Sequence, residues 1–565
     1  MRGPSLVVTL LLGLTVLAGC ASHPAPADDP PATPAAKVYA PLTTATHQAG
    51  HYIDANVPSF DGTPLHIGIQ LPDGDGPFPT ILSDTPYNAG STNHQGLEDQ
   101  FGLPLGASTY VTYGYAVAVS HVRGTGESGG CLNIGGPEEG KDGYALVEWI
   151  AQQPWSNGKV AMSGTSYVGT TPLETAVWQP PHLTTIIPTS PVTEWYRYYF
   201  ELGTHRRNGD PFPGSSDSDA ALWLAEGVVP GVPNGAMSGV EDARCPIEFF
   251  LEQDGQDDYD AYWHARDHHA KAANIKAPML FAHGWEDGNV APSGFPTLWA
   301  NVTAEKRLWM QQHGHGVPAS KADYHEYVHR WLDYWMLGLD NGALLLPPVI
   351  IEDNLGRYRA EQDWPPADAA PLRLELGADG ALTAAPGKAG TLSYSDDAVA
   401  PPVPGLPDQL RFAFGPVEEP IHLAGAPILH LKASSSMVGT QFDVNLLDVA
   451  PDGSFQLVDP AGNQAYVSRG FLDARHRDSL DHGSDLVPGT VYDLQFPLHF
   501  NDHVLQAGHT LLLVVKSTDD YVVRSPYRAT NTLQVGAGSS WLELPIVTDA
   551  GRTFVDEPPA PWASP

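Results

Sequence analysis

Three residues with the chemistry of nucleophilic catalysis occur in the order Ser166, Asp287, His315. Acyl transfer to a serine hydroxyl requires a base that takes the hydroxyl proton and a carboxylate that orients this base. Each residue follows a short apolar run: "KVAM" precedes the serine, "MLFA" the aspartate and "RLWM" the histidine. We therefore predict Ser166 as the nucleophile, His315 as the base and Asp287 as the acid that orients it.

The segment around the serine, "VAMSGTSYVGTT", has glycines on both sides of the candidate nucleophile. In the α/β-hydrolase fold this serine stands on a tight turn between a strand and a helix, and nearby glycines permit that turn. The spacing here is G-x-S-x-x-G, because Val168 occupies the usual glycine position and Gly169 follows it. Alone, the segment leaves open an ordinary Gly/Ser loop, but the order serine, acid, histidine is that of the fold.

Neighbouring residues compete for the acid and base roles. Glu286 is a second acid, although strand alternation would turn it the other way, and His313 is a second histidine. The pair in "HGH" also suits a metal, but no third and fourth ligand follow at zinc spacing, so we expect neither a metal nor an organic cofactor. We expect His268 and His269 on a solvated helix face.

Acyl transfer also requires donors that stabilise the developing oxyanion. The backbone amide of Tyr167, directly after the nucleophile, is the expected first donor. A second donor comes from the loop after an early strand, and "PTILSDTPYN" places the phenol of Tyr87 there. A packed ring in a Pro-Tyr turn is the alternative interpretation of that tyrosine.

The alternation of elements predicts the architecture. Strand-like and helix-like runs alternate over residues 46–190 and 272–348, which indicates a mostly parallel sheet with helices on its faces. Residues 191–271 are aromatic, acidic and rich in Pro and Gly, and we expect an inserted helical cap. Short runs separated by Gly, Asp and Pro over 349–555 predict an all-β jelly roll. The expected fold class is an α/β-hydrolase domain with a cap, followed by a β-sandwich.

The N-terminal residues predict export. The apolar run Leu6–Leu17 is too short to span a bilayer and is typical of a signal peptide. The ending "LAGC" resembles a bacterial lipobox, so we expect residues 1–20 to be a lipoprotein signal peptide with Cys20 lipidated, and Pro/Ala-rich residues 21–45 to be a tether. An ordinary signal peptide stays open. The predicted location is the bacterial cell envelope or, without a lipid anchor, the medium.

Charge and cysteines restrict the partners. A net charge of −36 disfavours nucleic acid, because a phosphate backbone requires basic patches. Beyond Cys20 the chain has Cys131 and Cys245, and an exported protein permits a disulfide between them without showing that they meet. The only membrane contact that we expect is the lipid anchor. A homo-oligomer stays open.

Six segments in order carry a family resemblance: "TPYN", "VRGTGESGG", "PWSNGKVAMSGTSYVG", "HGWEDGNV", "LWMQQHGHG" and "RWLDYWMLG". Together they resemble the Xaa-Pro dipeptidyl-peptidase family of serine hydrolases, which also contains cocaine esterase and the α-amino-acid ester hydrolases. "SRGFLDARHRDSL" and "LQAGHTLLLVV" resemble its C-terminal jelly roll. The resemblance spans residues from about 50 to 550 and implies nucleophile Ser166, acid Asp287, base His315, and oxyanion donors Tyr87 and the Tyr167 amide.

The branch of the family determines the expected substrate. Gly288, Asn289 and Val290 follow the acid where the aminoester hydrolases carry acidic residues, which disfavours that branch. We expect a peptidase that releases Xaa-Pro dipeptides from peptide N-termini. An esterase or amidase of small acyl compounds is the alternative, and a non-catalytic binding protein is a remote one.

A dipeptidyl-peptidase also needs a carboxylate for the substrate ammonium and aromatic walls for the proline ring. The candidates are Glu194, Trp195 and Tyr199 at the start of the cap, with Trp285 beside the acid. A role for these aromatic residues in the core of the cap stays open.

Overall fold

The computed structural model describes residues 39–86, 106–206, 257–316, 322–396, 406–455, 466–519, 521–523 and 525–560. The chain divides into residues 1–39 and a second unit, Ala40–Pro565, which contains all the elements below. Among the described residues, no helix combines the length and the apolar character that a membrane crossing requires. The predicted signal peptide, Cys20 and most of the predicted tether lie outside these residues.

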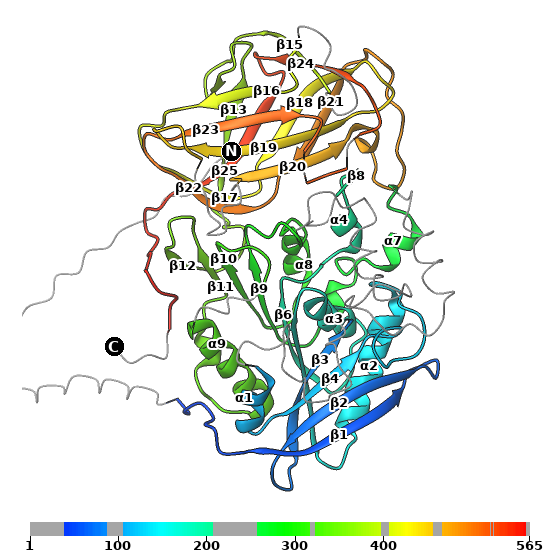
Figure 1. Cartoon of the computed structure of the whole chain (residues 1–565). Coiled ribbons are helices and arrows are strands. Elements are labelled where there is room, and N and C mark those ends of the chain that lie inside the picture. The colour runs from blue at the N-terminus through cyan, green and yellow to red at the C-terminus, as the bar shows by residue number, and fades with distance from the viewer. Residues whose placement is uncertain are drawn as a thin grey trace, which may run out of the picture. The chain divides into compact units, whose positions relative to one another are not determined.

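A mixed sheet forms the first part of this unit (Figure 1). In the described part of the chain it has ten strands in the order β1-β2-β4-β3-β5-β6-β9-β10-β11-β12, and all pairs from β4 to β11 are parallel. The strands are β1 (Ala49–Pro58), β2 (Pro64–Pro72), β3 (Phe78–Thr85), β4 (Ala116–His121), β5 (Ser156–Thr165), β6 (Leu183–Thr189), β9 (Met279–Gly284), β10 (Lys306–Gln311), β11 (Val349–Glu352) and β12 (Tyr358–Glu361). The predicted strand–helix alternation is confirmed.

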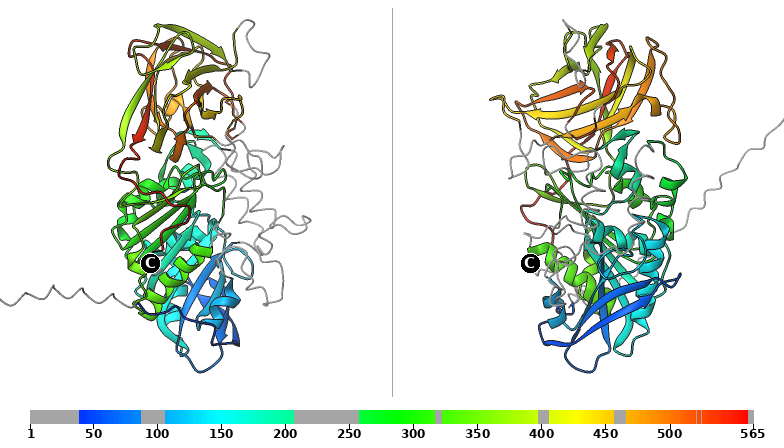
Figure 2. Two further views of the ribbon diagram at one scale, coloured as in Figure 1. Left: turned by 90° about the vertical axis from the view of Figure 1, so that its left-hand side faces the viewer. Right: turned by 45° about the vertical axis from the view of Figure 1, so that its right-hand side comes forward.

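Helices cover both faces of this sheet, as the further views in Figure 2 also show. Successive strand residues point to opposite faces, so Ala161 and Met162 of β5 enter different apolar clusters. One cluster contains side chains from α2 (Pro137–Ala151), α3 (Tyr167–Ala176) and α8 (Phe295–Asn301). The other contains side chains from α1 (Ala107–Thr112) and α9 (Ala322–Leu332), which continues as a π-helical turn, Asp333–Leu337.

The described residues of the predicted cap form short elements. These are α4 (Trp195–Tyr199), β7 (Phe200–Glu201), β8 (Thr204–His205), α7 (Ala261–Ala265) and the 3-10 helix Ala272–Asn274. Their aromatic side chains, together with Tyr167, form a buried cluster of their own. The rest of the predicted cap, residues 207–256, lies outside the described residues.

Two antiparallel sheets form the second part of the unit. In the described residues, a nine-stranded sheet contains β13 (Ala370–Leu376), β14 (Leu382–Thr383), β15 (Gly390–Ser395), β17 (Ile421–Gly425), β18 (Ile428–Ser435), β21 (Tyr492–Pro497), β22 (Asn501–Leu505), β24 (Thr530–Val535) and β25 (Trp541–Val547). A four-stranded sheet contains β16 (Leu410–Phe414), β19 (Gln441–Val449), β20 (Ser468–Asp473) and β23 (Thr510–Lys516). Their apolar side chains form one shared core, so the predicted α/β domain followed by an all-β domain is confirmed.

The end of the first sheet differs from the expected boundary. We expected the catalytic domain to end at residue 348, but β11 pairs in parallel with β10, and β12 pairs with β11. All four residues of the strand Val349–Glu352 are buried, as expected of an inner strand of a sheet that is covered on both faces. The first sheet therefore continues to Glu361.

A buried ion pair and a buried hydrogen bond between a carboxylate and a histidine join the two parts. Arg359 of β12 donates from Nη1 and Nη2 to the two carboxylate oxygens of Asp502 of β22, both at 2.6 Å. In the cap, both carboxylate oxygens of Glu201 lie 2.8 Å from Nε2 of His499 in the sandwich. Because unpaired charges in such buried positions are costly, these pairs fix how the cap, the first sheet and the sandwich fit together.

Candidate active site

Ser166 lies on a strained turn between β5 and α3. Its φ of 65° and ψ of −129° belong to a region that residues with a Cβ rarely adopt. The Ser166 amide donates to the Thr189 carbonyl at 3.0 Å, and the Ser166 carbonyl accepts the Gly169 and Thr170 amides at 2.9 and 3.0 Å. The backbone therefore holds the serine from both sides at the carboxyl end of β5.

Two glycines explain the irregular spacing of the motif. A Cβ on Gly164 would lie 2.4 Å from the Val168 carbonyl oxygen, and a Cβ on Gly169 would lie 2.4 Å from the Thr189 carbonyl oxygen. Both positions therefore require glycine for the close approach of backbone to backbone. Val168 has no such contact to avoid, since the close approach of α3 to β6 occurs one residue later.

We expect Ser166→Gly to be more stable than Ser166→Ala by about 1 kcal/mol in the free energy of unfolding. A residue held in such a sparsely populated region costs about 1–3 kcal/mol, and glycine avoids that cost while losing somewhat more chain entropy on folding. Urea unfolding of the two variants measures the difference, and neither retains the hydroxyl. A Ser166→Ala protein at least as stable as Ser166→Gly would contradict a strained turn.

The predicted acid and base are in contact. Nδ1 of His315 lies 2.7 Å from Oδ2 of Asp287. The aspartate follows β9 and its side chain is fully buried, whereas the histidine follows β10 and its side chain is 26% exposed. A proton on Nδ1 that is donated to the carboxylate leaves Nε2 as the proton acceptor, which is the tautomer that a general base needs.

The Asp287 carboxylate is held by four donors. Oδ1 accepts the backbone amides of Asn289 and Val290 at 3.0 and 2.8 Å. Oδ2 faces His283 Nε2 at 3.1 Å as well as His315. Burial alone raises the pKa of Asp287, but the charge of protonated His315 and the hydrogen bonds from both histidines bring this pKa well below its usual range.

The charge of Asp287 acts in turn on the base. Burial lowers the pKa of His315, while the Asp287 charge and the hydrogen bond to it raise the same pKa more, so the net value lies above that of an ordinary histidine.

His283 had no role in the sequence analysis. Its position in β9, four residues before the acid, was the available signal, because the turn after the strand brings residue 287 back toward residue 283.

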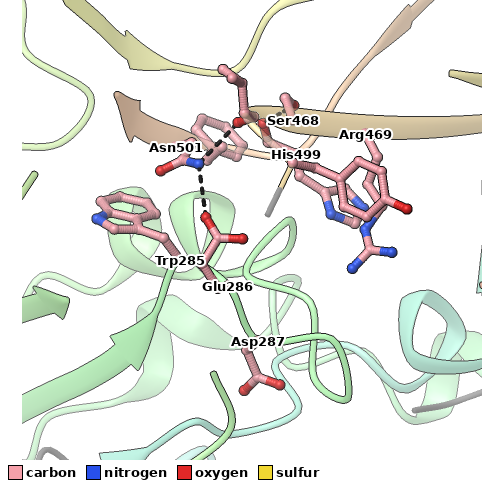
Figure 3. Close-up of a pocket in the computed structure, with 10 residues that line it drawn as sticks. Trp285, Glu286, Asp287, Ser468, Arg469, His499 and Asn501 are labelled. Carbon is pink, nitrogen blue, oxygen red and sulfur yellow. Dashed lines mark hydrogen bonds between the residues drawn. The ribbon is translucent and has the colours of Figure 1, made fainter. Parts of the chain in front are cut away.

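The competing acid and histidine face elsewhere. Figure 3 shows Glu286 pointing toward Asn501 of the sandwich while Asp287 points the other way. Nδ2 of Asn501 donates to Oε1 of Glu286 at 3.2 Å. His313 is exposed, and its Nδ1 lies 3.2 Å from the Gly314 carbonyl oxygen. The geometry therefore pairs Asp287 with His315 rather than either competitor.

The end of β6 joins the nucleophile turn to the histidine loop. Thr189 accepts the Ser166 amide at 3.0 Å, and the next residue, Ser190, donates its hydroxyl to the Gly316 carbonyl at 3.2 Å. The three predicted residues follow β5, β9 and β10, whose order in the sheet is β5-β6-β9-β10. They consequently lie at the same edge of the sheet, because parallel strands have their carboxyl ends at one edge.

The two predicted oxyanion donors have different outcomes. The Tyr167 amide belongs to the first turn of α3, where backbone N–H groups have no acceptor within the helix. The Tyr167 side chain has a different partner, because its hydroxyl donates to Oε2 of Glu139 at 2.7 Å. Tyr87 lies outside the described residues, so its role stays a prediction.

The predicted ammonium ligand, Glu194, is already paired. Arg197 donates from Nε to Oε2 of Glu194 at 2.9 Å, and Nδ1 of His269 lies 3.6 Å from the same oxygen. The Glu194 side chain is only 9% exposed. Binding a substrate ammonium here would require exchange of an existing partner, so this role stays a prediction.

The predicted aromatic walls are buried rings. Trp195 and Tyr199 belong to the aromatic cluster of the cap, and the Trp195 ring centroid lies 5.3 Å from that of Tyr167. Trp285 packs against Trp364, with centroids 4.9 Å apart. These contacts give all three rings a packing role, and the sequence analysis had left that alternative open. Their contact with substrate stays a prediction.

The expectation for His268 and His269 is wrong. They lie in a turn between α7 and the next 3-10 helix, with 3% and 9% exposure, rather than on a solvated helix face. The carboxylate of Asp267 accepts the His269 amide at 2.7 Å and closes this turn. His268 Nε2 then lies 3.6 Å from Oε1 of Glu174, beneath the cap.

Cys131 forms a disulfide. Cys245, the partner that the sequence analysis considered, lies outside the described residues, so the pairing itself stays a prediction. A disulfide is the chemistry expected of a chain that folds in an oxidising compartment.

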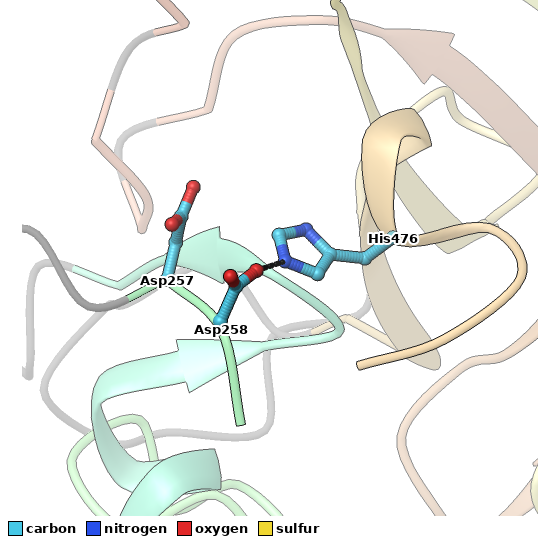
Figure 4. A group of neighbouring side chains, drawn as sticks. All are labelled: Asp257, Asp258 and His476. Atoms are coloured by element: carbon cyan, nitrogen blue, oxygen red, sulfur yellow. Dashed lines mark hydrogen bonds and ion pairs between the residues drawn. The ribbon is translucent and has the colours of Figure 1, made fainter. Parts of the chain in front are cut away.

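Within the described ranges, one group of side chains has ligand atoms close enough together for a cation. It contains Asp257, Asp258 and His476 (Figure 4). However, Arg475 donates to Asp257, and Oδ1 of Asp258 lies 3.0 Å from His476 Nε2 and accepts the Gly483 amide at 2.7 Å. Burial lowers the pKa of His476, but its acidic neighbours raise this pKa above the ordinary value. Two cationic partners favour an ion-pair cluster between cap and sandwich over a metal site.

Comparison with known proteins gives two matching family models. The model of X-Pro dipeptidyl-peptidase (S15 family) matches residues 61–317. The model of the X-Pro dipeptidyl-peptidase C-terminal non-catalytic domain matches residues 341–539. The first range includes all three predicted triad residues, and the second covers most of the sandwich.

Individual relatives extend over most of the chain. A putative Xaa-Pro dipeptidyl-peptidase of Bacillus cereus is 26% identical over 544 residues, which covers 88% of this chain and 89% of that protein. Cocaine esterase of a Rhodococcus species is 25% identical over 541 residues, covering 82% and 90%. A CocE/NonD family hydrolase from Staphylococcus aureus has a similar structure, with a TM-score of 0.73, 20% identity, and coverage of 87% and 93%. An α-amino acid ester hydrolase structure gives a TM-score of 0.72 at 22% identity, covering 92% and 100%.

Proposed function

Because the chain belongs to the Xaa-Pro dipeptidyl-peptidase family of α/β-hydrolase serine hydrolases, we propose that it hydrolyses acyl substrates through Ser166, Asp287 and His315. The observation that carries this proposal is the 2.7 Å contact between His315 Nδ1 and the buried Asp287 carboxylate. The strained turn that presents Ser166 supports it independently.

The proposed reaction has two halves. His315 Nε2 accepts the Ser166 hydroxyl proton while the serine oxygen attacks the substrate carbonyl, and the carbonyl oxygen becomes an oxyanion. The Tyr167 amide and the Tyr87 phenol donate to that oxyanion. His315 then protonates the leaving amine as its bond to the carbonyl carbon breaks. In the second half, His315 takes a proton from water while the water oxygen attacks the acyl carbon. The bond to the Ser166 oxygen then breaks, His315 returns the proton to that oxygen, and the acyl group leaves as a carboxylic acid.

The protonation state of His315 predicts how kcat/KM changes on the acidic side of its pH profile, which we call the acid limb. His315 accepts a proton only when it is neutral, so kcat/KM falls as the pH drops through the pKa of His315. Since Asp287 holds this pKa above the ordinary value, the fall begins at a higher pH than an isolated histidine would give. Asp287 keeps its charge throughout this range, because its own pKa lies well below the usual one.

We propose peptides with proline as the second residue as the substrates. The support comes from the family models and from relatives named Xaa-Pro dipeptidyl-peptidase. The similarity to cocaine esterase favours a second candidate, an esterase of small acyl compounds. Both candidates use the same three residues, and they differ in what the cap binds.

A panel of three chromogenic substrates tests this choice. A peptidase of this class cleaves Gly-Pro anilide, and it leaves N-acetyl-Gly-Pro anilide uncleaved because the acetyl group removes the ammonium. The third substrate is a simple nitrophenyl ester. Hydrolysis of the ester together with failure on both anilides contradicts the peptidase and supports the esterase.

We also propose that the chain is exported and tethered to the bacterial cell envelope by a lipid on Cys20. The support is in the sequence alone, in the apolar run Leu6–Leu17 and the ending "LAGC". Expression of the full chain and of Cys20→Ser in a bacterium tests it. We expect the unaltered chain in the detergent-extracted membrane fraction and the variant outside that fraction, and the same distribution for both contradicts the lipid anchor.

A further inference from the structure

Arg206 is a buried cation in the cap that donates hydrogen bonds to backbone carbonyls of two segments and to the hydroxyl of Tyr521. Only 2% of its surface is exposed. Nη1 donates to the carbonyls of Arg197 and Tyr198 at 3.2 and 3.4 Å. Nη2 donates to the carbonyls of Gly288 and Asn289 at 3.4 and 3.1 Å. A guanidinium has several donors in a fixed plane, so it can fix two backbone segments relative to each other.

The second of these segments is the turn that holds the Asp287 carboxylate. The amides of Asn289 and Val290 donate to Oδ1 of Asp287, and the carbonyls of Gly288 and Asn289 point to Arg206. Each peptide group is planar, so fixing the Gly288 carbonyl also fixes the Asn289 amide, and fixing the Asn289 carbonyl fixes the Val290 amide. The direction of the carboxylate therefore depends on these contacts.

The sandwich holds Arg206 from the other side. Nη2 of Arg206 donates to the Tyr521 hydroxyl, and the guanidinium carbon lies 4.5 Å from the centroid of the Tyr521 ring. The Val523 amide donates to the His205 carbonyl at 2.7 Å, so the backbones of cap and sandwich also pair here. Tyr521 itself stacks on Phe471 at 5.4 Å within the sandwich.

A pocket lies between the segment that contains Asp287 and the sandwich. It is small, with a cavity volume of about 20 Å³, and is lined on one side by Trp285, Glu286 and Asp287. Figure 3 shows Ser468, Arg469, His499 and Asn501 of the sandwich on its other side. Arg206 does not line this pocket, and its contacts to the acid turn and to Tyr521 join the two sides at a separate point.

We propose that Arg206 is a positioning residue that transmits support from the sandwich to the Asp287 turn. The inference rests on the proposed function, because it assigns Asp287 its catalytic role. It gives the sandwich, whose family model is described as a non-catalytic domain, a part in the geometry of the active site. Other charged groups near Arg206 include Glu201, Arg197 and Arg469, and the guanidinium of Arg469 also lies 3.8 Å from the centroid of the Tyr521 ring.

Three variants and one control test this inference in the full chain. Arg206→Met removes all the hydrogen-bond donors of the side chain. Arg206→Lys keeps the positive charge but not the planar guanidinium with its several donors. Tyr521→Phe removes only the hydroxyl. The matched control is Arg477→Met, since Arg477 also donates to two carbonyls, those of Ala474 and Ser484, and lies over a tyrosine ring, but within the sandwich. Thermal unfolding of each protein gives the folded fraction to which rates are normalised.

We expect Arg206→Met to lower kcat by about 100-fold with little change in KM, because a misplacement of about 1 Å in an active site has an effect of this size. Arg206→Lys and Tyr521→Phe lower kcat by smaller factors, and Arg477→Met leaves it unchanged. The acid limb of the kcat/KM profile also moves to lower pH in the Arg206 variants, because a misaligned Asp287 raises the pKa of His315 less.

A purely structural role changes thermal stability but neither the normalised kcat nor the acid limb, and this result overturns the inference. A change in KM alone overturns it too. If Arg206→Met does not fold, the test uses Arg206→Lys and Tyr521→Phe, and the normalised kcat and the pH of the acid limb of each variant decide it. An unaltered protein that neither cleaves substrate nor reacts with a fluorophosphonate contradicts the proposed function itself, which separates that failure from a failure confined to the variants.

Discussion

Replacing Ser166 with alanine lowers kcat on the best chromogenic substrate by about 10⁶-fold, with the folded structure retained. The variant removes the only atom that forms a bond to the acyl group in the proposed reaction. The rate that remains comes from substrate binding and oxyanion donors, which act without a nucleophile. Initial rates measured with concentrated enzyme over several hours give the required range.

The matched control for this prediction is Ser163→Ala. Ser163 is a buried serine of β5, three residues before the proposed nucleophile. We expect this variant to keep a rate within about tenfold of the unaltered enzyme, since its hydroxyl takes no part in the proposed chemistry. A Ser166→Ala protein with activity similar to that control contradicts Ser166 as the nucleophile.

Replacing Asp287 with asparagine lowers kcat by about 10⁴-fold, the second largest effect that we expect. The amide keeps the shape of the carboxylate, but it removes the charge and no longer selects the tautomer with Nδ1 protonated. The pKa of His315 falls as well, because the Asp287 charge is what raises it above the ordinary value. The small residual kcat/KM therefore declines at a lower pH than that of the unaltered enzyme.

Glu286→Gln is the matched control for the acid. It neutralises the adjacent carboxylate, which contacts Asn501 of the sandwich rather than His315. We expect its kcat to stay within about tenfold of the unaltered value and its acid limb to stay in place. Equal losses for Glu286→Gln and Asp287→Asn, measured as full kcat/KM profiles between pH 5 and pH 9, contradict the assignment of Asp287.

The positions of the predicted triad residues were accessible from sequence because they depend on local order. Ser166, Asp287 and His315 each follow an apolar run, and these runs are β5, β9 and β10 of one sheet. Parallel strands bring their carboxyl ends to one edge, so predicting the strands was sufficient to bring the residues together. The alternation of side chains along a strand likewise separated Asp287 from Glu286.

Contacts between distant segments were not accessible in this way. The pair of Glu201 and His499 joins residues that are 298 positions apart. Arg206 contacts the acid turn and the sandwich at once, and nothing in its local sequence indicates either partner. Such contacts depend on how the sandwich docks, which periodicity does not encode.

Local composition also led to one wrong prediction of exposure and to one wrong domain boundary. "ARDHHAKAA" has the polar character of a surface helix, but Asp267 closes a turn and buries His268 and His269 beneath the cap. The strand Val349–Glu352 was assigned to the sandwich because all-β patterns follow it, although its pairing with β10 places it in the first sheet. A run of four buried residues fits either kind of sheet.

Mass spectrometry of the protein after reaction with a fluorophosphonate tests the central claim most directly. The reagent forms a stable adduct only with a serine whose hydroxyl is activated by a neighbouring base. We predict one adduct per chain, on the peptide that contains Ser166, and none in Ser166→Ala under the same conditions. An adduct on another residue, or an unaltered protein that forms no adduct, contradicts Ser166 as the activated nucleophile.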